Sequence, residues 1–73
     1  MNILVIAGTR AEFASWQREF PERAKRAVYV ASREILCGWN AEECVLLWIG
    51  TYYKRDDYLQ LKDSAFSSGL MAE

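Results

Sequence analysis

Hydroxyl-bearing and cationic side chains stand together at three places in the chain, each directly after an apolar run. Thr9 and Arg10 follow the first run, Ser32 and Arg33 follow the second, and Thr51 and Lys54 follow the third. Side chains of these two kinds bind phosphate and other anions, and helix N-termini add backbone N–H donors. The pattern predicts an anion-binding crevice where the three runs end, with these six residues as its candidate ligands.

The established phosphate-binding motifs are absent from these three places. One glycine, Gly8, follows the first apolar run, where a dinucleotide-binding turn has three, and no lysine follows it at the spacing of a Walker loop. The alternative interpretation is that Gly8 and Gly50 only permit tight turns, while the nearby cationic side chains are solvated. Composition leaves both interpretations open.

Catalytic chemistry is not expected. The chain has no histidine, so the usual general base near neutral pH is missing. Glu12 stands three residues after Thr9, which is the spacing of a capping box at a helix start. The other acidic pairs, Glu42-Glu43 and Asp56-Asp57, are adjacent in sequence, so their side chains point in different directions and suit turns and helix starts.

The two cysteines predict neither a metal site nor a disulfide. Cys37 and Cys44 lie in apolar stretches, and their spacing matches no zinc motif. We expect two buried free thiols in a cytoplasmic protein without metal or cofactor.

No basic region precedes the short N-terminal apolar run, so a signal peptide is not expected, and no apolar stretch is long enough for a membrane span.

Three apolar runs alternate with three amphipathic segments. We expect strands at residues 3–7, 27–31 and 44–49, and helices at 10–20, 33–37 and 57–67, with a charged connector at 22–26. Phe13, Trp16 and Phe20 form one apolar stripe. The stripe of the last helix consists of Tyr58, Leu61 and Ala65 with Leu59 and Phe66 beside it, capped by Asp56 or Asp57.

The order βαβαβα predicts an α/β fold with a parallel sheet and right-handed crossovers. We expect one Rossmann-like mini-domain over residues 1–73, with a three-stranded sheet in the order 2-1-3, because the first strand is the most continuously apolar. The second crossover has only a turn and a half of helix. One face of the sheet is therefore thinly covered unless the last helix folds back over it, and parallel sheets need cover on each face.

A thinly covered sheet predicts self-association or a protein partner. The candidate interface residues are Trp39 and Trp48, with Leu70 and Met71 in the tail. The charges are also divided along the chain: residues 1–33 carry net +3 and residues 34–73 net −4, for a total of −1. A dipolar molecule can associate head to tail or steer a charged partner, whereas the near-neutral total argues against binding to nucleic acid.

Two resemblances add to this interpretation. The opening MNILVIAGTRAEF resembles the first strand and turn of the UDP-N-acetylglucosamine 2-epimerases, which typically have Gly-Thr-Arg-Pro-Glu there. The resemblance implies a phosphate contact for Arg10. It covers about thirteen residues of 73, Ala11 replaces the proline, and the chain is too short for the second domain of that family. The epimerase activity is therefore not expected.

The whole chain also resembles short α/β proteins of tailed bacteriophages, especially those of actinobacteria. The shared pattern is a strand ending in Gly-Thr-Arg-Ala, a Val-Tyr-Val strand, and a third strand ending in Gly-Thr with an aromatic after it. This resemblance implies a cytoplasmic setting in an infected bacterium. We expect a non-enzymatic protein that acts by protein–protein contact, with itself or with a host protein. The alternative is a nucleotide- or phosphate-binding module that uses the Gly-Thr turns.

Overall fold

The three expected strands form one parallel sheet. The computed structural model describes residues 2–70, except the side chains of Cys37 and Ala41. Strands β1 (Asn2–Ala7), β2 (Ala27–Tyr29) and β3 (Cys44–Ile49) lie in the order β2-β1-β3. Six residues of β1 pair with β3, from Asn2 with Cys44 to Ala7 with Ile49, and three pair with β2. The α/β class and the strand order 2-1-3 are confirmed.

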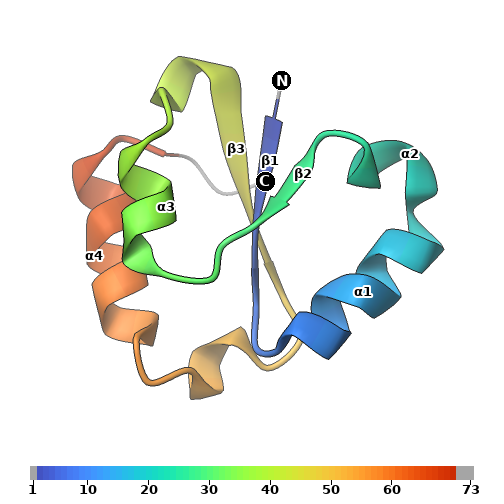
Figure 1. Ribbon diagram of the computed structural model, residues 1–73. Coiled ribbons are helices and arrows are strands. Elements are labelled where there is room, and N and C mark those ends of the chain that lie inside the picture. Colours follow the sequence, from blue (N-terminus) through green and yellow to red (C-terminus); the bar gives the residue numbers. More distant parts are fainter. Residues whose placement is uncertain (1, 71–73) are drawn as a thin grey trace.

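The helices form a layer on each face of the sheet (Figure 1). Helices α1 (Arg10–Glu19) and α2 (Pro21–Ala24) cover one face, and α3 (Arg33–Cys37) and α4 (Tyr58–Ser67) cover the other. Two short 3-10 turns, η1 (Ala41–Glu43) and η2 (Tyr52–Lys54), flank β3. The predicted charged connector was partly wrong, because Pro21 starts α2: its fixed φ suits the first position of a helix.

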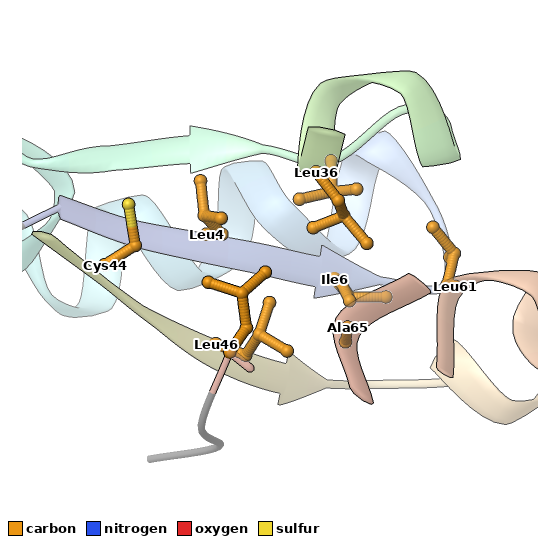
Figure 2. Packing of buried hydrophobic residues seen from close by; sticks show 9 residues of the cluster. Leu4, Ile6, Leu36, Cys44, Leu46, Leu61 and Ala65 are labelled. Atoms are coloured by element: carbon orange, nitrogen blue, oxygen red, sulfur yellow. The ribbon is translucent and has the colours of Figure 1, made fainter. Parts of the chain in front are cut away.

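The face covered by α3 and α4 holds the larger core cluster. Figure 2 shows Leu4 and Ile6 of β1 packed between Leu46 of β3, Leu36 of α3 and Leu61 of α4. Helices α3 and α4 contact one another, so the last helix does fold back over the thinly covered face. Helix α4 therefore covers the part of this face that the short α3 does not reach.

The opposite face has one long helix and a smaller cluster. Phe13 and Trp16 of α1 pack on Ile3 and Val5 of β1. Their rings are 6.0 Å apart, and that of Phe13 is 5.2 Å from that of Tyr29. Phe20, predicted in the same stripe, is 42% exposed, because it follows the last residue of the helix and its backbone is no longer helical.

The end of α4 corrects the prediction for the tail. Gly69 has φ +74°, and the N–H groups of Gly69 and Leu70 donate to the carbonyls of Phe66 and Ala65 at 3.1 and 3.0 Å. These are the two hydrogen bonds of a Schellman motif, which turns the chain back on the helix. Leu70 is therefore buried in the core beside Leu61 and is not available as an interface residue.

Candidate functional site

The two Gly-Thr turns lie side by side at the carboxyl edge of the sheet, because Ala7 pairs with Ile49 directly before them. The carboxylate of Glu12 joins them. The Thr51 N–H donates to Glu12 Oε2 at 2.8 Å, and the Thr51 hydroxyl donates to Glu12 Oε1 at 2.7 Å. The position predicted for an anion is thus filled by a carboxylate of the chain itself.

Thr9 caps α1 as predicted, but Glu12 does not return the bond. The Glu12 N–H donates to Thr9 Oγ1 at 3.2 Å. In a capping box the Glu12 carboxylate would accept from the Thr9 N–H; here it accepts from Thr51 and, more weakly, from the Thr9 hydroxyl at 3.4 Å. The first helix start is therefore linked directly to the turn after β3.

Gly8 and Gly50 are required by this carboxylate. A Cβ atom on Gly8 would overlap Thr51 and the Glu12 carboxylate, and one on Gly50 would overlap the same carboxylate. Gly50 also has φ +60°, which other residues adopt rarely. Each glycine has thus a packing reason that involves no bound ligand, as the alternative interpretation of the turns proposed.

The hydrogen bonds at the turns fix the charge of Glu12. Donation from the Thr51 hydroxyl and then from the Thr51 N–H holds the pKa of Glu12 below its ordinary value of 4.5, against a smaller opposing effect of burial. The carboxylate is ionised at neutral pH. A phosphate placed between the turns would meet this negative charge and would have to replace Glu12 as the acceptor of the Thr51 donors.

Arg55 closes the rest of the carboxyl edge. Its Nη1 donates to the carbonyl oxygens of Ala7 and Val30 at 3.1 and 2.8 Å, and its Nη2 donates to that of Ala31 at 2.8 Å. The same guanidinium forms a two-pronged ion pair with Asp57, with Nε at 2.9 Å from Oδ1 and Nη2 at 3.0 Å from Oδ2. Its side chain is only 9% exposed, so it is a structural clamp across the ends of β1 and β2.

The roles of Arg55 and Asp57 were not foreseen. The sequence analysis expected Asp56 or Asp57 to cap α4; Asp57 does occupy the cap position, but its carboxylate makes no cap hydrogen bond. It pairs with Arg55 instead. The sequence holds a weak signal for this pair, since an Arg and an Asp two residues apart stand in the loop after a predicted strand.

The remaining predicted ligands do not converge. The Arg10 guanidinium lies over the Tyr29 ring, with Cζ 4.9 Å from the ring centroid, which is a cation–π contact. Ser32 is half-buried and makes no cap hydrogen bond to α3, while Arg33 and Lys54 are exposed. Of the six predicted ligands, only Thr9 and Thr51 are joined, through Glu12.

The predicted interface residues differ in how far they are buried. Trp39 and Trp48 are half-buried and pack against the larger core cluster, and the Trp48 ring lies 5.3 Å from that of Tyr52 and 5.9 Å from that of Tyr58. Leu70 is core, as described above. Met71 lies outside the described residues.

A shallow groove lies between α1 and β3. It has a volume of about 280 Å³ and is lined by Glu12, Ser15, Trp16, Glu19, Ile49 and Gly50. Val45, Leu47 and Ile49 of β3 are half-buried on the same face. Helix α1 covers β1 and α2 covers β2, so within residues 2–70 the β3 side of this face lacks a helix of its own. Both charged residues of the lining are acidic.

Comparisons add no relative to this description. No model of a protein family, no curated protein and no solved structure matches the chain. Within residues 2–70, no group of three or more potential metal ligands comes together. In the same range, no helix has the length and apolar character needed to cross a membrane.

Proposed function

We propose that the chain is a non-enzymatic binding protein that acts by contact with another protein through the groove between α1 and β3. The observation that carries this proposal is the row of half-buried side chains Val45, Leu47 and Ile49 on the side of the sheet without its own helix. A parallel sheet is normally covered on each face along its whole width. The opposite face meets this requirement with two helices, α3 and α4 (Figure 1).

The chemistry of the groove defines the partner. Its floor is apolar, with Trp16 and Ile49, and its charged residues are Glu12 and Glu19. An amphipathic helix fits this surface if it places an apolar stripe on β3 and Lys or Arg residues along the edge that faces α1. The Glu12 carboxylate contributes a fixed negative charge to this recognition, because Thr51 holds it in place.

The resemblance to small bacteriophage proteins makes a bacterial host protein the partner to test first. The alternative function, binding of a nucleotide or phosphate at the Gly-Thr turns, has less support. The donors that such a ligand would need on Thr51 already bond to Glu12, and Arg10 lies over Tyr29.

Site-specific photo-cross-linking in bacterial cells tests the proposal. A photoreactive residue is placed at Ser15, which is exposed in the groove lining, and as a control at Arg33, which is exposed at the start of α3. We expect a partner protein to be cross-linked from position 15 and not from position 33. The cross-linked segment of that partner should be an amphipathic helix with Lys or Arg residues along one edge. Glu19→Lys should abolish this product, whereas Glu34→Lys, the same charge change on α3, should leave it. Equal products from both positions, or none from position 15, would overturn the proposal.

A further inference from the structure

Two large apolar side chains stand fully outside the core on α4. Leu59 is 72% exposed and Phe66 is 87% exposed. They are seven residues apart, which is two helical turns and about 10 Å along the axis, so they lie on one stripe of the helix. The sequence analysis expected them beside the buried face; the structure places them on the outer one.

The rotation of α4 about its axis is fixed, so this exposure is built into the fold. Leu61 and Ala65 are buried under it, and the Schellman motif with Leu70 ties its end to the core. Leu59 and Phe66 cannot turn inward without removing these buried residues. The stripe has no cover within residues 2–70.

Two opposite charges lie between the apolar residues. Lys62 and Asp63 are both exposed, and neither side chain forms an ion pair or hydrogen bond with another described residue. On a helix, each residue advances by about 100°, so Lys62 lies on one side of the Leu59–Phe66 line and Asp63 on the other. The stripe is therefore Leu59, Lys62, Asp63 and Phe66, named below the α4 stripe.

The α4 stripe is complementary to itself. A two-fold axis parallel to the helix, beside the stripe, generates a second, parallel copy in which Leu59 faces Leu59, Phe66 faces Phe66 and Lys62 faces Asp63. The contact between Lys62 and Asp63 then occurs twice, as in every isologous interface. An antiparallel two-fold pair would instead place Lys62 against Lys62 and Asp63 against Asp63, so the charges select the parallel one.

We infer that the chain forms a two-fold dimer through parallel packing of the α4 stripes of two copies. The interface consists of one helix pair, which is at the small end of protein interfaces, so we expect a reversible dimer with a dissociation constant on the order of 10–100 μM. This surface is on the opposite face of the sheet from the groove of the proposed function. The two proposals therefore stand or fall separately.

Sedimentation equilibrium of the full chain tests the dimer, over about 10 μM to about 1 mM, a range that brackets the expected affinity. Phe66→Ser should weaken it at least about tenfold, because the contact between the two Phe66 side chains loses both of its partners. Lys62→Asp and Asp63→Lys should each weaken it as well, since each variant sets like charges against one another. All three positions are exposed, so the variants keep the fold.

A mixture of the two charge variants tests the pairing of Lys62 with Asp63 directly. Equal amounts of the Lys62→Asp and Asp63→Lys chains should form a heterodimer, in which every facing pair is again of opposite charge, and the double variant with both changes should dimerise like the original. Lys54→Asp, an exposed residue outside α4 with the same change of charge, is the control and should leave the dimer intact. A chain that stays monomeric throughout this range, or a dimer that ignores these substitutions, would overturn the inference.

Discussion

Glu12 and Arg55 occupy the edge of the sheet at which proteins of this topology commonly bind ligands. In open parallel sheets that place is the crevice beyond the carboxyl ends of the strands, where the strand order reverses. Here Glu12 bridges the turns after β1 and β3, and Arg55 bridges the ends of β1 and β2. Side chains of the chain itself therefore occupy the hydrogen-bonding groups that a ligand at this edge would need.

Glu12→Gln should make the stability of the protein less dependent on acid. The folded state lowers the pKa of Glu12 below 4.5 through the Thr51 donors, so this carboxylate stabilises the fold above its ordinary pKa, and the contribution is lost as the pH falls through the lowered value. Urea unfolding measured from neutral pH to about pH 3 should show a smaller decline for Glu12→Gln than for the unchanged chain.

The control for this measurement is Glu19→Gln, which removes an exposed carboxylate from the same helix. It should follow the unchanged chain. If Glu12→Gln and the unchanged chain lose stability in parallel as the pH falls, the link between Glu12 and Thr51 does not stabilise the fold.

Arg55→Lys should be strongly destabilising despite the retained positive charge. One ammonium cannot reach three carbonyl oxygens and both oxygens of Asp57, which the planar guanidinium does here. We expect a loss of roughly 2–3 kcal/mol, because nearly buried acceptors lose a charged donor. Chemical denaturation measures it, and Lys54→Ala, the exposed neighbour, should change stability by less than about 0.5 kcal/mol. Equal effects at the two positions would contradict the role of Arg55 as a clamp.

At the scale of elements, the end of α4 depends on one glycine. Gly69 has φ +74°, whereas Gly38, which ends α3, has φ −88°. A Cβ would meet no atom within 4 Å at Gly69 and only a carbonyl oxygen at 3.8 Å at Gly38. Space is therefore available at each position, and the two glycines differ in backbone conformation alone.

Gly69→Ala should destabilise the protein by about 1 kcal/mol, because alanine is strained at positive φ. Gly38→Ala should be neutral or stabilising by up to about 1 kcal/mol, because it only restricts the unfolded chain. Thermal unfolding of the two variants side by side distinguishes these effects. A larger loss at Gly38 than at Gly69 would show that the Schellman motif is not what ends α4.

The sequence was sufficient for the features that depend on local pattern. Continuous apolar runs marked the three strands, and Thr9 marked the start of α1, because each depends on residues a few positions apart. The position of Leu70 could also have been predicted from the sequence. Gly69 followed by the apolar Leu70 after a helix is the signature of a Schellman motif, and this motif places Leu70 in the core. The outward position of Leu59 and Phe66 likewise follows from their angle to Leu61.

The carboxyl edge depends on contacts that no local pattern encodes. Glu12 and Thr51 are 39 residues apart, and Arg55 reaches Ala7 across 48 residues. At the level of sequence, a glutamate three residues after a threonine is explained fully by a capping box, so nothing indicates a more distant partner. The two matching Gly-Thr turns were recognised, but the side chain that joins them was not.

For the whole molecule, the sheet separates two surfaces. The α4 stripe lies in the α3–α4 layer, and the groove lies between α1 and β3 on the other face (Figure 1). A dimer formed through the α4 stripe therefore leaves both grooves open, and the two-fold axis directs them away from one another. Such a dimer would be a bivalent binder of the amphipathic helix described above.

Bivalence predicts a difference that appears only when the partner is clustered. The probe is a synthetic amphipathic helix with an apolar stripe and lysines along one edge. In solution, the unchanged chain and Lys62→Asp should each bind one peptide per chain with equal affinity, because position 62 is remote from the groove. On a surface densely coated with the peptide, the unchanged chain should dissociate at least about tenfold more slowly, since rebinding by the second groove is intramolecular. Sparse coating should remove the difference. Binding of one peptide per two chains would instead mean that the dimer covers the groove.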